Sequence, residues 1–236
     1  MERAETPATI VVVEDEADMA RVLQFNLQSL GHRVLLAPTA TEALRLVAAA
    51  VPDLVLLDLR LPDGFGMDLL RDFRAAPRTA ALPVIVVSAL GDEPTVVQAL
   101  ECGADDVVSK PFRTRELLAR VATALRRHAA PAETGIAAAP LAFGPLRMAP
   151  ETREVSAAGE PVELTRTEFD LLAFFVTHPE RVFTRRQLCE QALGSGGAIL
   201  ERTIDAHVRT LRRKLGPAGQ CLVTVWGVGY RLVDSP

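Results

Sequence analysis

The chain has 236 residues, of which 49% are hydrophobic and 24% charged, and its net charge is −4. These proportions are typical of a globular protein and exclude wholesale disorder. At about 100–200 residues per domain, the length fits one large domain or two ordinary ones, and the negative net charge excludes a molecule that is basic throughout.

The charge is unevenly distributed along the chain. Residues 1–127 contain 14 Lys and Arg against 18 Asp and Glu, whereas residues 181–215 contain 8 basic and 3 acidic residues. Three widely spaced cysteines fit neither a disulfide framework nor a CxxC metal site. No secretory signal is visible, and no apolar run approaches the ~20 residues that span a bilayer, so we expect a cytoplasmic protein without membrane contact.

Short apolar runs alternate with amphipathic ones in the first half of the chain. The apolar runs predict strands at 9–13, 33–37, 53–58, 83–88 and 106–109. The intervening segments have helical spacing and predict helices at 16–30, 39–50, 66–75, 94–102 and 113–128. Strands that are apolar throughout and alternate with helices indicate an α/β fold with a parallel sheet covered on both faces.

A second composition begins after residues 128–140, which are rich in Ala and Pro and predict a flexible linker. Short β-like runs fill 141–164, and helical patterns follow at 165–178, 185–193 and 200–215. Residues 221–225 and 230–233 flank a Gly-Val-Gly turn and predict a terminal hairpin. We therefore expect one domain over 1–127, a linker over 128–140 and a second domain over 141–236.

Chemically distinctive side chains stand where the predicted strands of the first domain end. Glu14 and Asp15 end the first strand, Asp58 the third and Ser88 the fourth, while Lys110 follows the fifth. In a parallel sheet these ends share the edge at which ligands bind. Strand-terminal acids are often merely solvated, but three acids, a serine and a lysine at matching strand ends favour a site.

The residue types at this edge indicate phosphoryl chemistry. Carboxylates suit Mg²⁺, which binds through few carboxylates plus substrate phosphate, and a carboxylate beside the ion can attack phosphorus. Lys110 is one of two lysines in a chain with 24 arginines. A compact ammonium suits a buried phosphoryl oxygen better than a planar guanidinium does.

Four segments of the first domain resemble the receiver domain of two-component response regulators: VVVEDE (11–16), PDLVLLDLRLPDGFG (52–66), PVIVVSAL (83–90) and GADDVVSKPF (103–112). The resemblance implies a flavodoxin-like, doubly wound sheet of five parallel strands. It also implies that Asp58 accepts a phosphoryl group from a sensor histidine kinase.

The same resemblance assigns roles to the neighbours of Asp58. It implies that Asp15, Asp58 and the backbone carbonyl of Arg60 bind Mg²⁺, with Glu14 assisting through water. Ser88 is expected to hydrogen-bond the phosphoryl group and Lys110 to pair with it. Pro111 is expected to follow a cis peptide bond.

One position departs from the receiver pattern. The family usually has an aromatic residue or His three positions before the lysine, and its ring turns inward on activation. Here the residue is Val107, which is small and stiff. Either the switch works by backbone shift alone, or phosphorylation is weakly coupled to output, or the change is simple drift in a buried strand.

The helix predicted at 200–215 has an apolar face formed by Ile204, Val208, Leu211 and Leu215, with arginines on the opposite side. Such a helix is either a solvated surface element or one that enters a major groove. The segments LTRTEFDLL (164–172), RVFTRRQL (181–188), ERTIDAHVRTLRRKL (201–215) and TVWGVGYRL (224–232) resemble the winged helix-turn-helix effector domain of the OmpR/PhoB family.

This second resemblance implies binding to double-stranded promoter DNA, with RNA polymerase as a further candidate partner. The positions that match DNA contacts of the family are Arg202, Thr203, His207, Arg209, Arg212 and Trp226. Many members have arginine where this chain has Thr210 and Trp226, so fewer phosphate contacts and a shallower salt dependence are expected. His207 alternatively packs within the domain.

The receiver resemblance also implies a homodimer on activation, formed by the fourth helix, fifth strand and fifth helix. Asp105, Asp106, Glu116 and Arg120 match the charge network of that interface. Val96 replaces the usual basic residue, which leaves the charge partner of Glu116 open, and Val96 and Val97 offer an apolar contact instead. Two tethered winged helices would bind direct repeats about one DNA turn apart.

The main interpretation is a phosphorylation-regulated transcription factor that is not an enzyme acting on a separate substrate. A regulator that dimerises and binds DNA without phosphorylation is the alternative, motivated by Val107 and Val96. A third interpretation is an aspartyl-phosphate hydrolase, but such enzymes commonly have an acid two residues after the nucleophile, and here that residue is Arg60.

Overall fold

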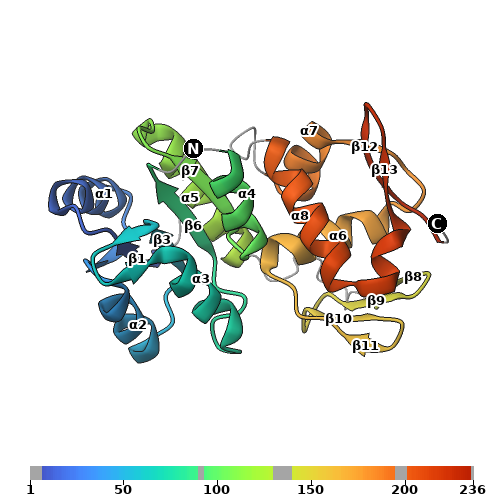
Figure 1. Cartoon of the computed structure of the whole chain (residues 1–236), viewed down its shortest axis with the longest axis horizontal. Helices are drawn as coiled ribbons and strands as arrows, with labels where there is room; N and C mark the ends of the chain where they lie inside the picture. Colours follow the sequence, from blue (N-terminus) through green and yellow to red (C-terminus); the bar gives the residue numbers. More distant parts are fainter. Residues whose placement is uncertain (1–6, 90–92, 130–139, 195–200, 235–236) are drawn as a thin grey trace. The chain divides into compact units, whose positions relative to one another are not determined.

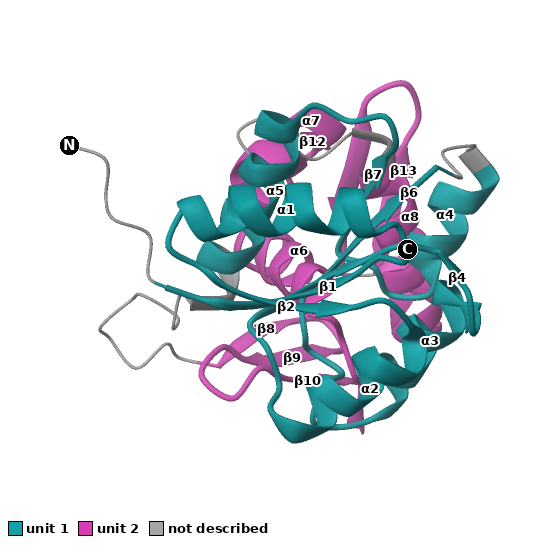
Figure 2. Ribbon diagram, turned by 90° about the vertical axis from the view of Figure 1, so that its left-hand side faces the viewer, with its two compact units in different colours: residues 1–129 teal, residues 130–236 magenta. Residues whose placement is uncertain are grey.

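The computed structural model describes residues 7–89, 93–129, 140–194 and 201–234. The chain divides into two compact units, residues 1–129 and 130–236, which Figure 2 colours separately. Most of the predicted linker at 128–140 lies outside the described residues. None of the described helices has the length and apolar character needed to cross a membrane.

Unit 1 is built on a five-stranded parallel sheet in the order β2-β1-β3-β6-β7 (Figure 1). The strands are β1 (Thr9–Val13), β2 (Arg33–Ala37), β3 (Leu54–Leu57), β6 (Val84–Ser88) and β7 (Asp106–Ser109). The chain winds outward from β1 in one direction and then in the other, so the strand order reverses between β1 and β3. This confirms the predicted doubly wound sheet, whose ligands bind at such a reversal.

Five helices flank this sheet: α1 (Ala17–Ser29), α2 (Ala40–Ala49), α3 (Gly66–Ala75), α4 (Glu93–Glu101) and α5 (Thr114–Ala129). Figure 2 shows α1 and α5 on one face and α2 and α3 on the other. Apolar residues of α1 and α5, such as Leu27 and Leu117, pack on alternate residues of the strands in one buried cluster. Thr39 caps the N-terminus of α2, since its hydroxyl accepts from the Glu42 amide at 3.0 Å.

A short hairpin between β3 and α3 was not predicted. It pairs β4 (Arg60–Leu61) with β5 (Gly64–Phe65) around the Pro-Asp turn at 62–63. Strands of two residues show no hydrophobic period, so only the turn residues signal them.

Unit 2 begins with a four-stranded antiparallel sheet formed by β8 (Leu141–Phe143), β9 (Leu146–Ala149), β10 (Glu154–Ala157) and β11 (Glu160–Pro161). Three helices follow: α6 (Arg166–Thr177), α7 (Arg185–Gln187) and α8 (Glu201–Lys214). The helix predicted at 185–193 is only partly correct, because the backbone changes to a π-helix over Leu188–Ala192.

The unit ends in the predicted hairpin, β13 (Leu222–Val225) and β14 (Gly229–Leu232), after a 3₁₀ segment at Gly216–Cys221. A strand that was not predicted, β12 (Phe183–Thr184), pairs with β14 and completes a three-stranded sheet. Gly229 permits this pairing, since a Cβ there would stand 2.0 Å from the Phe183 carbonyl oxygen. The helices and hairpin share one apolar core that includes Phe175, Phe183 and Leu211, which is the architecture of a winged helix.

Candidate functional site

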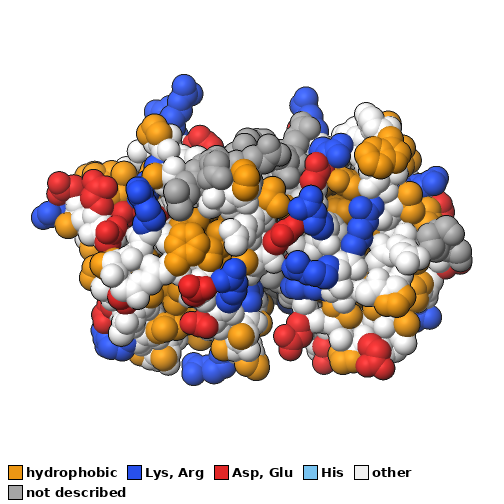
Figure 3. Space-filling model, in the orientation of Figure 1, with side chains coloured by type: hydrophobic (Ala, Val, Ile, Leu, Met, Phe, Trp, Pro, Cys, Tyr) orange, Lys and Arg blue, Asp and Glu red, His pale blue; other side chains and the backbone are white. Residues whose placement is uncertain are grey.

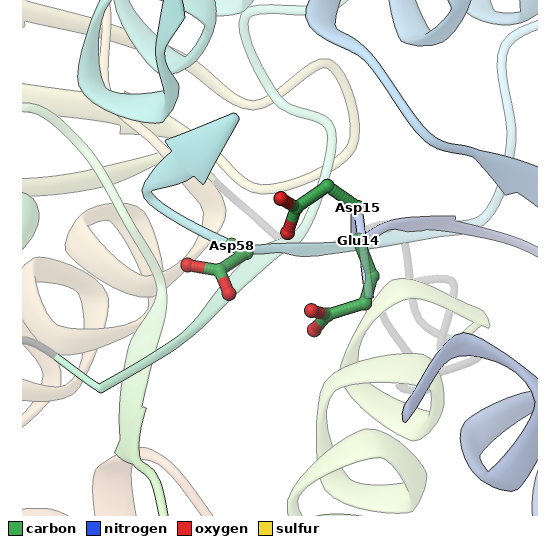
Figure 4. Close-up of side chains that lie close together, drawn as sticks. All are labelled: Glu14, Asp15 and Asp58. Carbon is green, nitrogen blue, oxygen red and sulfur yellow. The ribbon is translucent and has the colours of Figure 1, made fainter. Parts of the chain in front are cut away.

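Three carboxylates converge at the carboxyl edge of the unit 1 sheet, as Figure 4 shows. Glu14 and Asp15 directly follow β1, and Asp58 directly follows the neighbouring strand β3. One ligand oxygen from each residue lies within 4.8 Å of the others. Glu14 and Asp58 are buried and Asp15 is exposed, so the cluster opens to solvent on the Asp15 side.

Lys110 balances part of this negative charge. Its Nζ donates to Glu14 Oε2 and to Asp58 Oδ2, both at 2.6 Å. The side chain is 14% exposed. A single ammonium therefore bridges the ends of β1 and β3 and fixes one oxygen of Asp58. The other oxygen, Oδ1, accepts from the backbone N–H of Arg60 at 3.0 Å.

The local electrostatics follow from this geometry. Burial raises the pKa of Glu14, since desolvation outweighs the hydrogen bond and charge of Lys110. Burial by itself lowers the pKa of Lys110, but the hydrogen bonds and charges of Asp58 and Glu14 outweigh it and raise that pKa overall. The ammonium therefore stays charged beside Asp58 at neutral pH.

The β4–β5 hairpin after Asp58 is held at its turn and at its base. In the turn, Asp63, which the sequence did not single out, accepts from the backbone N–H groups of Ala40 and Thr41 at 2.8 and 2.9 Å and from the Thr41 hydroxyl at 2.8 Å. At the base, Gly66 N–H donates to Leu59 O at 2.8 Å. These contacts fix the β4–β5 hairpin that carries Arg60.

Ser88 and Lys110 are joined through the backbone. Ser88 ends β6 and is buried, and the N–H of Lys110 donates to its carbonyl oxygen at 2.8 Å. The Lys110–Pro111 peptide bond is cis, as predicted. Val107 lies buried in β7 opposite Val86, so the strand that leads to Lys110 has no aromatic ring at this position.

The residues present fit a divalent cation. Glu14 Oε1 is buried and has no hydrogen-bond partner among the described atoms, which leaves an oxygen available for a bound ion or its water. The donor set is all carboxylate, the kind that Mg²⁺ prefers. Asp15 and Asp58 would hold the ion and Glu14 would assist. The Arg60 carbonyl stays a predicted ligand.

The second group of candidate residues lies on α8 and the β13–β14 hairpin. Arg209 and Arg213 are exposed on α8, and Figure 3 shows Lys and Arg side chains gathered over this helix. Trp226 is 90% exposed at the tip of the hairpin, next to Gly227 with its positive φ of 75°. The side chain of Arg202 lies outside the described residues.

Two other predicted DNA contacts are buried. Thr203 is 0% and His207 1% exposed, and Thr210 is also 0% exposed. The buried surface of α8 is thus wider than the predicted apolar face, since it extends to the polar positions beside it. That Thr203 and His207 touch DNA stays a prediction.

Arg212 makes contacts within unit 2. Its Nε donates to Leu222 O and its Nη2 to Thr224 Oγ1, both at 2.8 Å. Its guanidinium carbon lies 5.7 Å from the centre of the Tyr230 ring. Two nitrogens of Arg212 therefore tie α8 to the hairpin.

The predicted dimer-interface residues are engaged within unit 1. Arg120 pairs with Asp106 and, at 2.7 Å, with Glu116, so Glu116 has an intramolecular charge partner that the sequence left open. Burial would lower the pKa of Arg120, but these two carboxylates raise it overall.

Asp105 and Val96 are buried, each no more than 3% exposed. Asp105 accepts from the backbone N–H of Val84 at 2.9 Å and from Arg74 at 3.1 Å. Val96 therefore has no exposed surface for the expected apolar contact, whereas its neighbour Val97 is only half-buried.

An acidic cluster with a lysine at the edge of a doubly wound sheet, followed by a winged helix, defines a two-domain response regulator. The comparisons agree with this class. The family model described as "Response regulator receiver domain" matches residues 10–122, and that described as "Transcriptional regulatory protein, C terminal" matches residues 159–232.

Relatives and solved structures match nearly the whole chain. The phosphate regulon transcriptional regulatory protein PhoB of Pseudomonas aeruginosa is 40% identical over 224 residues, 94% of this chain and 96% of that protein. The sensory transduction protein RegX3 of Mycolicibacterium smegmatis is 40% identical over 227 residues, 95% and 98% of the two chains. A solved structure of a RitR mutant has a TM-score of 0.76 and 29% identity, and the match covers 95% of this chain and 98% of that one. The chain belongs to the OmpR/PhoB family of response regulators.

Proposed function

We propose that the chain is a transcription factor whose receiver unit is phosphorylated on Asp58 by a histidine kinase in the presence of Mg²⁺. The contact that carries the proposal is the bridge from Lys110 Nζ to Glu14 and Asp58, at 2.6 Å to each. It orients a buried carboxylate and supplies a cation where a phosphoryl group would gain negative charge.

The transfer follows from the positions of these groups. An oxygen of Asp58 attacks the phosphorus of a phosphohistidine, the new P–O bond forms as the P–N bond breaks, and the imidazole nitrogen keeps the electron pair. Lys110 then exchanges its contact with Asp58 for one with a phosphoryl oxygen, and the Ser88 hydroxyl donates to another. Bound Mg²⁺ would supply charge neutralisation at Asp15 and Asp58.

We further propose that phosphorylation promotes a receiver homodimer, which brings two winged helices onto promoter DNA. Exposed Arg209 and Trp226 are the contacts best supported by the structure, with Arg202, Thr203 and His207 proposed from the family pattern. Linking two weak DNA contacts raises the effective concentration of the second. Promoter occupancy therefore changes without any change in the DNA-binding residues.

A phosphorylation-independent regulator is the second candidate. It is favoured by Val107, since a buried valine cannot report on Ser88 by ring rotation. The two candidates differ in how binding to a selected DNA duplex responds to beryllofluoride and Mg²⁺. The wild type and Asp58→Ala are each measured with and without these additions. If the additions tighten DNA binding by the wild type and not by Asp58→Ala, the phosphorylation-dependent regulator is supported. Equal affinity in all four samples refutes the phosphorylation-dependent regulator.

A further inference from the structure

Unit 2 contains an ionic and aromatic network that joins three elements far apart in sequence. Tyr230 on β14 donates its hydroxyl to Asp205 Oδ1 on α8 at 2.7 Å. The same oxygen accepts from Arg185 Nε, at the start of α7, at 2.6 Å. One carboxylate oxygen of α8 therefore holds both α7 and the hairpin.

The Tyr230 ring lies near two guanidinium groups. The guanidinium carbons of Arg185 and Arg212 lie 5.3 and 5.7 Å from the ring centroid. Both distances are within the range of a cation–π contact. Tyr230 is 5% exposed, so these cations lie where the ring has little competing water.

Arg212 extends this network along the hairpin. Its contacts to Leu222 O and Thr224 Oγ1, both 2.8 Å, reach the first and third residues of β13. Because the guanidinium is planar and rigid, two such bonds fix an angle as well as a distance. The tip of this hairpin carries the exposed Trp226, so the network determines where Trp226 lies relative to α8.

We propose that Arg185, Asp205, Arg212 and Tyr230 are positioning residues that fix the β13–β14 hairpin against α8, and that Arg212 acts on DNA binding by this route rather than by contacting a phosphate. The inference rests on the proposed DNA-binding function and differs from the family expectation for Arg212. It predicts that the Arg212–Thr224 contact matters for affinity although Arg212 touches no phosphate.

Two variants isolate this contact. Arg212→Met keeps an unbranched apolar stem and removes the guanidinium donors, while Thr224→Val keeps the β-branched shape and removes the acceptor oxygen. The double variant tests whether Arg212 and Thr224 affect DNA binding through their shared hydrogen bond. Arg209→Met is the matched comparison, since Arg209 is exposed on the same helix.

The first readout is the salt dependence of binding to a duplex that the wild-type chain selects from a random-sequence pool. Each phosphate contact contributes about 0.9 to the slope of log affinity against log salt concentration. Arg209→Met should reduce the slope by about that amount. Arg212→Met should weaken binding about tenfold and keep the wild-type slope. Thr224→Val should also weaken binding. The double variant should bind no more weakly than Arg212→Met, because both substitutions remove the same contact.

The second readout needs no DNA. Trp226 is the only tryptophan of the chain, so its time-resolved fluorescence anisotropy reports nanosecond motion of the hairpin tip. Arg212→Met and Thr224→Val should both lower the residual anisotropy, and Arg209→Met should not.

Several outcomes would overturn the inference. A slope that falls in Arg212→Met as much as in Arg209→Met would make Arg212 a phosphate contact. Unchanged Trp226 anisotropy in Arg212→Met would show that Arg212 does not hold the hairpin. A wild-type chain that selects no duplex in the presence of beryllofluoride and Mg²⁺ would instead refute the proposed function, and the anisotropy measurement would still decide whether the network positions the hairpin.

Discussion

Replacing Asp15 with Asn should stabilise the metal-free protein. The Asp15 ligand oxygen lies within 4.8 Å of those of Glu14 and Asp58, whereas the ammonium of Lys110 contacts only the latter two. Asp15 therefore adds repulsion to a cluster whose cation is already engaged. Removing its charge relieves two repulsive pairs.

The size of the effect follows from Coulomb's law. Since Asp15 is exposed, a dielectric constant near that of water applies, and each pair at this separation is worth about 0.9 kcal/mol. Two pairs give about 2 kcal/mol, and salt screening reduces the gain to about 1–2 kcal/mol. Asp15→Asn should also lose the stabilisation by Mg²⁺, which in the wild type reaches about 1.4 kcal/mol at ten times the dissociation constant.

Calorimetry at low salt, in EDTA and then in MgCl₂, measures both effects. The absorbance of Tyr230, the only tyrosine and 5% exposed, marks the unfolding of unit 2, so the remaining transition belongs to unit 1. Asp18→Asn is the matched control, because Asp18 is exposed on α1 in a surface pair with Arg21, and such pairs contribute at most about 1 kcal/mol. An Asp15→Asn protein that is less stable without metal, or as responsive to Mg²⁺ as the wild type, would refute the reasoning.

Two further predictions concern single residues. Burial, with the hydrogen bond to Asp205, raises the pKa of Tyr230 to about 12. Because the phenol of the unfolded chain ionises near 10, the protonated Tyr230 contributes its full stabilisation below pH ~10 and loses it between pH ~10 and ~12. As Tyr230 is the only tyrosine, phenolate absorbance should titrate near 12, and nearer 10 in Asp205→Asn; a wild-type midpoint near 10 would contradict this. Gly66→Ala should destabilise unit 1 by about 1–3 kcal/mol, because its Cβ would stand 2.3 Å from the Asp58 carbonyl oxygen. Gly64→Ala, with nothing within 4 Å, should unfold at nearly the wild-type denaturant concentration, and equal losses in the two variants would contradict the packing argument.

The carboxylate cluster could be predicted because it depends on local signals. An apolar run followed by an acid marks a strand end, and parallel pairing then brings Glu14, Asp15 and Asp58 to one edge. The bridge from Lys110 to both Glu14 and Asp58 required the structure, since residue types at strand ends determine no side-chain distance.

Ion pairs between residues far apart in the chain could not be predicted from the hydrophobic pattern of the sequence. Asp105 pairs with Arg74, 31 positions away, and Arg185 reaches Asp205 across 20 positions. Neither pair has a helical or strand spacing that would link its members. The burial of Val96 was missed for a related reason, because an apolar residue on a helix is equally suited to a core and to an interface.

The most direct test of the central claim is the sedimentation mass of the full chain with and without beryllofluoride and Mg²⁺, with Asp58→Ala as the control. The account predicts a monomer that becomes a dimer only when the wild-type chain receives both additions. A dimer in every sample would support control without phosphorylation. A monomer in every sample would contradict the proposed coupling between Asp58 and DNA binding through receiver dimerisation.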